Sequence, residues 1–412
     1  MGEELAGSEA QHERFRYDPE RYWGGFPEAV PGEAEGAQAL PDWAIGPFTK
    51  HPGNPVLAPS PDGWDVGARG GVHNGSILHR NGKFHYVYRG WMPHPPTVYD
   101  EWLCGYFDWV CDIGLATSDD GVHFVKDRAH SPFFRTGDDK RFSFEDVNLV
   151  EHEGVYYLFC NRWEWERFKD PAWNGVYLAT STDLLHWDKV GLVFPGATTM
   201  HRNACVLQNP RNQAVRVNGK FVMFLNFHMI AYSDDLIHWQ SRPIPPERHW
   251  PGGEGCFALA DYRRTDPDAV LLFTGGNHSG HFYAIGEARF SKKDLTQPIE
   301  WLPRPVLTAD PSIPFEDGPN PSPTSATPSF SPALPATPTP GGSTTAAASA
   351  TPAWPKPRSR GKRGGGASQH AKVAAIGYGS GLGIQKTLEA VQRQEIIRGQ
   401  MPQGSLPGEP VK

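Results

Sequence analysis

The sequence lacks the patterns that would assign it to several common functional classes. Its 412 residues include only five cysteines, which form no CxxC pair and are too few for a disulfide framework. It contains no HExxH motif, no phosphate-binding P-loop and no GxGxxG run after a strand. We therefore expect reduced cysteines, no metal ion and no nucleotide cofactor.

Charge and hydropathy argue against two further kinds of partner. The formal net charge is −7, which gives no electrostatic reason to expect a nucleic acid. No apolar run approaches the roughly 18 residues that span a bilayer, and the first residues lack the apolar core of a secretory signal. These features predict a cytoplasmic protein that binds neither nucleic acid nor membrane; its oligomeric state stays open.

Turn formers and aromatic residues are abundant. The chain has 45 glycines and 40 prolines, and 12% of its residues are aromatic. Glycine and proline together reach about a fifth of the chain, against about an eighth in average proteins. Many turns imply many short strands, and the aromatic content is typical of a packed β-protein with a sugar or another ring-stacking ligand.

Composition divides the chain into four parts. Residues 1–44 are acidic and show little periodicity, which predicts an irregular N-terminal arm. Residues 45–318 have globular composition, whereas residues 319–370 are dominated by Pro, Ser, Thr and Ala and are expected to be disordered. In the tail, 371–412, Ile384, Leu388 and Val391 fall at helical spacing and predict one short helix.

The globular part repeats a four-strand unit. Hairpin patterns begin at Gly75, Asp146 and Ala204, and each is followed by a further strand and a Ser-Asp or Ser-Thr-Asp turn. A looser fourth copy begins at Cys256. Four strands recurring about every 55 to 65 residues indicate the blades of a β-propeller.

The repeated turns are expected to be structural. Short polar side chains at such positions bond their own backbone and close the last hairpin of each unit. Histidines share one turn position in three repeats, which argues for a structural role and against metal binding. The residues concerned are Asp119, Asp120, Asp183, Asp234, Asp235, His123, His186 and His238.

These motifs resemble a known family. HPGNPVL at 51–57, DGWD at 62–65 and the SDDGVHF, STDLLHW and SDDLIHW turns resemble the five-bladed propellers of glycoside hydrolases. The likeness is greatest to family 130, the β-mannoside phosphorylases and β-1,2-mannosidases, and it extends from about residue 48 to 318. HNGSIL at 73–78, FEDVNLV at 144–150 and LPRPVLTADPSIPFEDG at 302–318 add to it. The resemblance implies an all-β, five-bladed propeller.

The sequence departs from that family in two places. Val147 and Asn148 replace the Pro-Arg that follows the family's Glu-Asp, which removes a cation that the phosphorylases use for phosphate. The chain also becomes low-complexity after Gly318, where the last blade should continue. We therefore expect an incomplete or atypical last blade, unless the N-terminal arm and the tail after Ala371 supply its strands.

Cleavage of a glycosidic bond commonly requires two carboxyl groups. The family resemblance makes Asp146 the general acid, with a salt-bridged or turn-capping aspartate as the alternative. Glu145 is its neighbour, and because adjacent strand residues point to opposite faces, only one of the two is expected to face the propeller axis. Glu254, in a glycine-rich turn, is the candidate for the second carboxylate; the alternative is a solvated loop glutamate.

Further polar and aromatic residues at the ends of inner strands are candidates for substrate binding. Guanidinium and amide groups can make paired hydrogen bonds to sugar hydroxyls, and tryptophan can stack on a sugar ring. His201 and Arg202 could also bind phosphate, and Asp317 is a candidate through the family resemblance alone. The full set is Asn74, Arg89, Asn161, Arg162, Trp163, His201, Arg202, Asn203, Asn226, His228 and Asp317.

The sequence favours a glycoside hydrolase that cleaves β-mannosides or related β-linked oligosaccharides. Three alternatives stay open. One is a β-mannoside phosphorylase with inorganic phosphate as co-substrate. Another is a relative of families 43 or 32, against which Asn74 counts because those families place an acidic residue in the first inner strand. The last is a carbohydrate-binding propeller that has lost catalysis.

Overall fold

The computed structural model describes residues 40–308 and 373–374. Within the first range, residues 47, 50, 54, 67–71, 101–104, 135–141, 165–166, 168–169, 200, 227 and 279–281 are not described. The predicted Asp317, the 319–370 segment and the helix near Leu388 therefore lie outside the described residues. No helix long and apolar enough to cross a membrane occurs in the described part.

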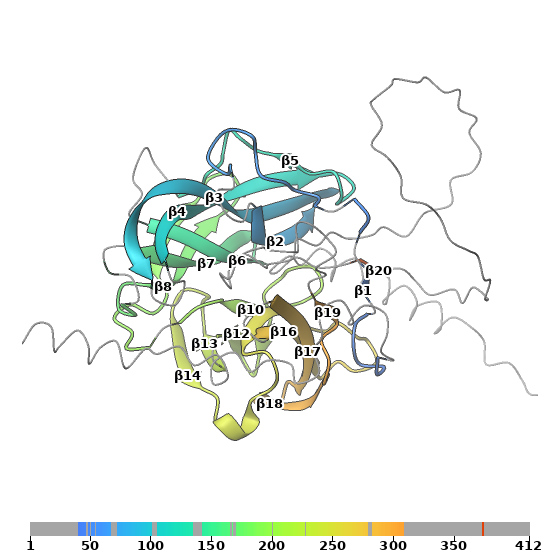
Figure 1. Cartoon of the computed structure of the whole chain (residues 1–412). Helices are drawn as coiled ribbons and strands as arrows, with labels where there is room; N and C mark the ends of the chain where they lie inside the picture. The colour runs from blue at the N-terminus through green and yellow to red at the C-terminus, as the bar shows by residue number, and fades with distance from the viewer. Residues whose placement is uncertain are drawn as a thin grey trace, which may run out of the picture.

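The described chain is all-β and forms successive four-stranded antiparallel units (Figure 1). Blade 1 contains β2 (Val72–Arg80), β3 (Lys83–Asp100), β4 (Gly105–Ser118) and β5 (Val125–Lys126). Blade 2 contains β6 (Phe142–His152), β7 (Val155–Glu164), β8 (Gly175–Ser181) and β9 (Asp188–Leu192). Blade 3 contains β10 (Cys205–Gln208), β12 (Lys220–Leu225), β13 (Met229–Ser233) and β14 (Trp239–Pro243). Blade 4 contains β15 (Glu254–Ala260), β16 (Ala269–His278), β17 (Phe282–Ser291) and β18 (Asp294–Trp301).

Short elements connect or extend these blades. β11 (Arg216–Val217) pairs with β12, β19 (Leu307–Thr308) pairs with β17, and a 3-10 turn, η2, covers Pro246–Arg248. The inner strands of blades 3 and 4 pair in parallel, with Leu207 opposite Ala258. Blades 3 and 4 are therefore joined through their backbones as well as through their cores.

Tight turns fix the register of the hairpins. Asn81-Gly82, Glu153-Gly154 and Asn218-Gly219 each occupy two consecutive positions with positive φ, between 50° and 82°. Such left-handed pairs match the twist of the flanking strands, and Asn-Gly is the sequence that adopts them most readily. The hairpins predicted from these dipeptides are confirmed.

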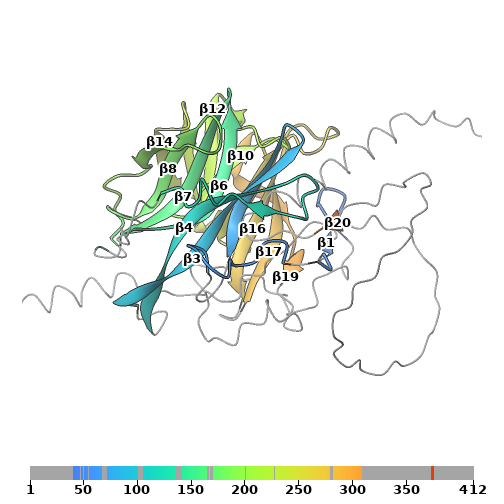
Figure 2. The same ribbon diagram turned by 90° about the horizontal axis from the view of Figure 1, so that it is seen from above.

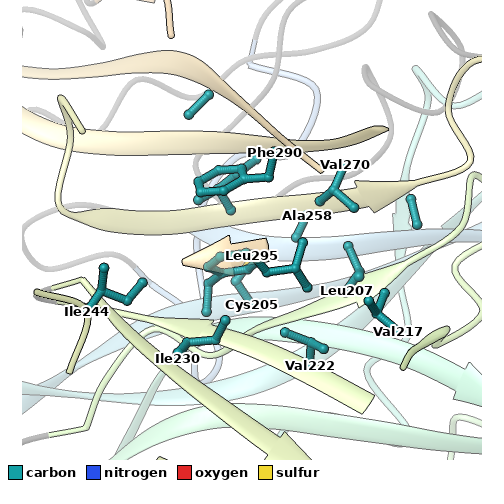
Figure 3. Packing of buried hydrophobic residues seen from close by; sticks show 14 of the residues in the cluster. Cys205, Leu207, Val217, Val222, Ile230, Ile244, Ala258, Val270, Phe290 and Leu295 are labelled. Carbon is teal, nitrogen blue, oxygen red and sulfur yellow. The ribbon is translucent and has the colours of Figure 1, made fainter. Parts of the chain in front are cut away.

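The hydrophobic core is divided into layers between neighbouring blades. In Figure 3, Val222 and Ile230 of blade 3 face Ala258, Val270 and Phe290 of blade 4. Corresponding clusters lie between blades 1 and 2 and between blades 2 and 3. Because each blade packs face to face with the next, the sheets follow one another around a common centre, as Figures 1 and 2 show. The propeller predicted from the repeats is confirmed.

Residues that precede β2 pack on blade 1 and on blade 4, on the faces that no other described blade covers. Ile45 and Phe48 pack in the cluster on blade 4, whereas Leu57 and Trp64 pack on blade 1. The backbone amide of Ile45 also donates to the buried Glu287 carboxylate of blade 4 at 3.0 Å. This segment thus occupies part of the sector between blades 4 and 1, where a fifth blade belongs.

One strand pair lies in that sector. β1 (Phe48–Thr49) pairs in parallel with β20 (Val373–Ala374), so a segment after Ala371 does meet the N-terminal segment. The described residues contain four four-stranded blades. The prediction of an incomplete or atypical last blade after Gly318 lies outside the described residues.

Candidate active site

The first strands of blades 1, 2 and 4 begin irregularly, and the irregularities fall at matching places. β2 has a bulge between His73 and Ser76, β6 between Glu145 and Asn148, and β15 between Gly255 and Phe257. Bulges redirect side chains and are common next to active sites. The residues directly after the bulged positions therefore need not follow strand alternation.

Three residues at matching positions adopt left-handed backbone geometry. Asn74, Asp146 and Asn203 have φ of 46°, 50° and 51°. Asn and Asp tolerate this region better than other non-glycine residues, because their short polar side chains bond locally. The same local geometry thus places one polar side chain in each of blades 1, 2 and 3 at the end where the inner strands begin.

Asp146 accepts hydrogen bonds from three blades. Its Oδ1 accepts from Asn74 Nδ2 at 2.6 Å and from Arg89 Nη1 at 3.2 Å. Its Oδ2 accepts from Asn161 Nδ2 at 2.8 Å and from Arg202 Nη2 at 3.5 Å. The side chain is 11% exposed, so this carboxyl group lies in a nearly closed, donor-rich setting. The prediction that Asp146 faces the centre is supported, whereas its catalytic role stays a prediction.

Glu145 faces the same cluster, which corrects one sequence-based expectation. Arg89 Nη2 lies 3.1 Å from Glu145 Oε1 while its Nη1 contacts Asp146, so both adjacent carboxyl groups bind one guanidinium. The expectation that only one of the pair faces inward was wrong because the bulge at Asp146 interrupts strand alternation. Burial raises the pKa of Glu145, against the opposing effect of Arg89.

Arg202 enters the cluster from blade 3. Its guanidinium carbon lies 4.7 Å from the centroid of the Trp163 ring, a stacking distance. Its ion-pair distances to Glu145 and Asp146 are 3.8 Å and 3.5 Å. Its Nε is buried and has no hydrogen-bond partner in the described part of the chain. This cation is therefore held in place by an aromatic ring and only loosely by carboxylates.

Glu254 joins the cluster from blade 4. The residue is 3% exposed, and its Oε1 accepts from Asn226 Nδ2 at 3.2 Å. Burial raises the pKa of Glu254 well above its usual range; Arg202 opposes this, and the charge of Asp146 raises it further. Glu254 therefore keeps a proton at pH values at which an ordinary glutamate is ionised.

Amide side chains link the two halves of the cluster. Asn161 Nδ2 donates to Asn203 Oδ1 at 2.7 Å, and the Asn203 amide donates to Asn161 Oδ1 at 2.9 Å. Three other buried oxygens lack partners within the described residues: Asn74 Oδ1, Asn226 Oδ1 and Glu254 Oε2. Buried polar atoms are nearly always paired, so these oxygens indicate a place where a polar ligand can bind.

Three predicted binding residues lie away from this cluster. Arg162 points to the other face of β7, where its guanidinium stacks on Phe142 at 5.0 Å. His201 Nδ1 lies 2.8 Å from the Thr199 carbonyl oxygen and its Nε2 lies 2.7 Å from Ser241 Oγ. Both ring nitrogens of His201 are therefore engaged, and burial lowers its pKa.

His228 is also engaged elsewhere. Its Nε2 bonds the Trp250 carbonyl oxygen at 2.9 Å, and its ring stacks on His249 with centroids 3.9 Å apart. Burial and the neighbouring His249 lower its pKa to about 4, so the ring is neutral at pH 7. The structure thus gives His201, His228 and Arg162 packing partners and brings together the other predicted residues that it describes.

Sequence reasoning missed two members of the cluster. Glu145 is one, and Cys111 is the other: its Sγ accepts from Arg89 Nε at 3.1 Å. A signal for Glu145 was present in the matching runs HNGS, EDVN and RNAC, which align Asp146 with two asparagines and mark an irregular strand start. Cys111 carried no such signal, because its place depends on the pairing of β3 with β4. No metal-binding cluster occurs among the described residues.

The arrangement of the blades defines the class of fold. Blades arranged around a centre are those of a five-bladed β-propeller, and in this chain polar side chains converge where the inner strands begin. No family model matches the chain. A 1,2-β-oligomannan phosphorylase from Thermoanaerobacter sp. (strain X514) is 29% identical over 267 residues, covering 61% of this chain and 79% of the relative.

Solved structures share the fold. A glycosyl hydrolase from Bacteroides ovatus has a TM-score of 0.51 and 24% identity, over 65% of this chain and 82% of its own. A second structure has a TM-score of 0.53 and 23% identity. It is described as coming from the GH130 family of mannoside phosphorylases, which contains glycoside hydrolases that target β-1,2-mannosidic linkages in Candida mannan. It matches over 68% and 85% of the two chains. The resemblance to glycoside hydrolase family 130 is confirmed.

Proposed function

We propose that the chain is an inorganic-phosphate-dependent β-mannoside phosphorylase. The observation that carries the proposal is a cation held beside a pair of carboxyl groups but only loosely bound by them. Arg202 lies 3.5 Å and 3.8 Å from its two carboxylate neighbours, whereas strong charged hydrogen bonds measure about 2.7–2.9 Å. Its guanidinium therefore retains capacity for an anion such as phosphate.

The charge balance of the cluster permits an anion to enter. Arg89 and Arg202 offset the negative charges of Glu145 and Asp146, and the raised pKa of Glu254 keeps that group from adding another. Because Glu254 keeps its proton more readily than an ordinary glutamate, it adds less negative charge to the path of a phosphate that approaches Arg202. The 1,2-β-oligomannan phosphorylase relative supports both phosphate and a mannoside as substrates.

In the proposed reaction a phosphate oxygen attacks the anomeric carbon of the terminal mannosyl unit. The bond from that carbon to the bridging oxygen breaks, and the bond's electron pair stays on the leaving oxygen. Glu254, which keeps a proton, supplies it, and Asp146 passes it to that oxygen in the role of general acid that the family resemblance implies. The products are mannose 1-phosphate and an oligosaccharide shortened by one unit.

Asp146 and Glu254 act in this proposal as an interacting pair. Interacting carboxyl groups titrate together, so a proton held by the pair belongs to neither residue alone. Asn74 and Asn161 hold the Asp146 carboxyl in a fixed orientation through bonds of 2.6 Å and 2.8 Å. Asn226 Oδ1, which lacks a partner in the described chain, can accept from a sugar hydroxyl.

The experiment is incubation of the purified protein with β-1,2-mannobiose, with and without inorganic phosphate. The proposal predicts mannose 1-phosphate that forms only when phosphate is present. Arg202→Gln should raise the KM for phosphate by about tenfold or more, the effect of one charged hydrogen bond. Mannose release at an equal rate without phosphate would contradict the proposal, as would binding of the disaccharide without cleavage.

Hydrolysis is the second candidate, and one observation favours it. Asn148 stands where the family's phosphorylases have an arginine, and here its Oδ1 accepts from the Val206 amide of blade 3 at 3.0 Å. That position therefore ties two blades together and supplies no cation. The comparison with and without phosphate separates the two reactions directly.

A further inference from the structure

The loop between β7 and β8 carries an exposed tryptophan that the proposed site does not use. Trp173 is 44% exposed. β6 begins near Asp146 and β7 returns antiparallel to it through Asn161 to Glu164, so this loop lies at the site end of blade 2. Trp301, the other strongly exposed tryptophan among the described residues, lies on the outermost strand β18.

The described residues of the loop, 167 and 170–174, are joined by hydrogen bonds of their own. Asn174 is buried; its Oδ1 accepts from the Glu164 amide at 2.6 Å, and its Nδ2 donates to the carbonyl oxygens of Arg167 and Asp170. The Trp173 amide donates to the Asp170 carbonyl oxygen at 3.1 Å. The backbone of Trp173 is therefore fixed by hydrogen bonds although its side chain is exposed.

The same loop is bonded to a residue that directly follows a member of the cluster, although the side chain of that residue lies on the other face of β7. Arg162 Nη2 donates to the Trp173 carbonyl oxygen at 2.6 Å. Arg162 directly follows Asn161, whose side chain binds Asp146, and consecutive Cα atoms are about 3.8 Å apart. The backbone of Trp173 is thus anchored through a residue adjacent to the cluster.

One part of the indole ring is covered by a cation. The guanidinium carbon of Arg167 lies 3.7 Å from the Trp173 ring centroid. The arrangement matches Arg202 on Trp163 inside the cluster, at 4.7 Å. A guanidinium on one face holds the ring in orientation while the rest of the ring stays in water. A fixed, part-exposed aromatic surface is suited to a ligand that is apolar on one face and polar at its edges.

We propose that Trp173 is a specificity-determining residue on which a sugar unit beyond the cleaved bond stacks. The inference rests on the proposed function. An oligomannoside whose terminal unit lies beside Asp146 must leave the site at the end where the β7–β8 loop lies, because the inner strands begin there. A disaccharide ends close to the cluster, whereas a longer chain extends over this loop. Trp173 therefore favours longer substrates over the disaccharide.

The test compares β-1,2-mannobiose with β-1,2-mannotetraose in wild type, Trp173→Ala and Trp173→Phe. We expect Trp173→Ala to lower the tetraose-to-biose ratio of kcat/KM about tenfold, through KM, which corresponds to one aromatic contact of about 1.4 kcal/mol. Trp173→Phe keeps a stacking ring and should restore most of the ratio. Trp301→Ala, the matched control, should leave both substrates unaffected.

An unchanged ratio in Trp173→Ala overturns the inference, as does an equal loss on both substrates together with failed rescue by phenylalanine. If the wild type cleaves neither sugar, the proposed function fails. The preference for the tetraose is then measured as the ratio of the two dissociation constants, determined by calorimetry. A tetraose preference that disappears in Trp173→Ala then still supports the stacking role. Absence of binding to both sugars overturns both proposals.

Discussion

At one end of blades 1, 2 and 3 the same turn occurs three times, whereas at the other end each blade contributes different polar side chains. In the repeated turn of blade 1, Ser118 Oγ accepts from the Gly121 amide at 2.9 Å, and Asp120 Oδ1 accepts from the His123 amide at 2.8 Å. The turns of blades 2 and 3 repeat both bonds within 0.1 Å.

At the site end the backbone repeats but the chemistry does not. Asn74, Asp146 and Asn203 share one left-handed conformation, yet only Asp146 is a carboxylate. In the repeated turns the aspartates bond their own loops, whereas at the site end Asn74 Oδ1 and Glu254 Oε2 have no partner in the described chain. Satisfied, repeated bonds stabilise the fold, whereas varied residues with unpaired buried atoms are the pattern that we expect of a ligand site.

The largest effect that this comparison predicts is on activity. Asp146→Asn keeps the shape of the side chain and removes the group that gives a proton, so the rate should fall at least about 10²-fold. The melting temperature should also fall, because the amide nitrogen cannot accept from the donors that bond to one of the two carboxylate oxygens. The rate of mannoside cleavage and a thermal melt measure the two quantities. An unchanged rate would remove Asp146 from the mechanism.

A smaller effect, on stability alone, is predicted at the opposite end. Asp120→Ala removes bonds to the Val122 and His123 amides, each 2.8 Å, and should lower the free energy of unfolding by about 1 kcal/mol. Asp119→Ala is the matched control: the Asp119 side chain is 82% exposed and pairs only with Lys83 in the described chain, an ion pair that contributes little to stability. Urea denaturation measures both. Equal losses in the two variants would mean that the turn bonds do not matter.

The stability that the Asp120 turn contributes should also depend on pH. Partial burial tends to raise the pKa of Asp120, but the His123 side chain and the two backbone amides lower it to well below its usual range. A folded-state pKa below the unfolded one stabilises the protein above the unfolded value, about 3.9, and this stability is lost as pH falls below it. The difference between wild type and Asp120→Ala should therefore shrink below about pH 4.

Local patterns made the fold predictable. Asn-Gly dipeptides determine the hairpins, and the Ser-Asp turns determine the last strands, because each depends on residues that lie close together in the sequence. The site was less predictable. Glu145 faces inward because of a bulge. His201 is hydrogen-bonded to Ser241, which lies 40 residues further along the chain. Neither fact could be derived from strand alternation.

Division of the chain by composition had a similar limit. The boundary at residue 44 follows a change in composition, yet Ala44 and Ile45 both pack on blade 4 with Phe273. That contact joins segments more than 200 residues apart and leaves no local trace in the sequence. It depends on the hydrophobic face that blade 4 presents, which is known only once the sheets are placed.

The central claim is that Asp146 and Glu254, from different blades, act as one unit. The direct measurement is the rate of mannobiose cleavage in Asp146→Asn, Glu254→Gln and the double variant. Residues that act together give strongly non-additive losses. We predict that the double variant is no slower than the slower single variant; a loss equal to the product of the two single losses would contradict the account.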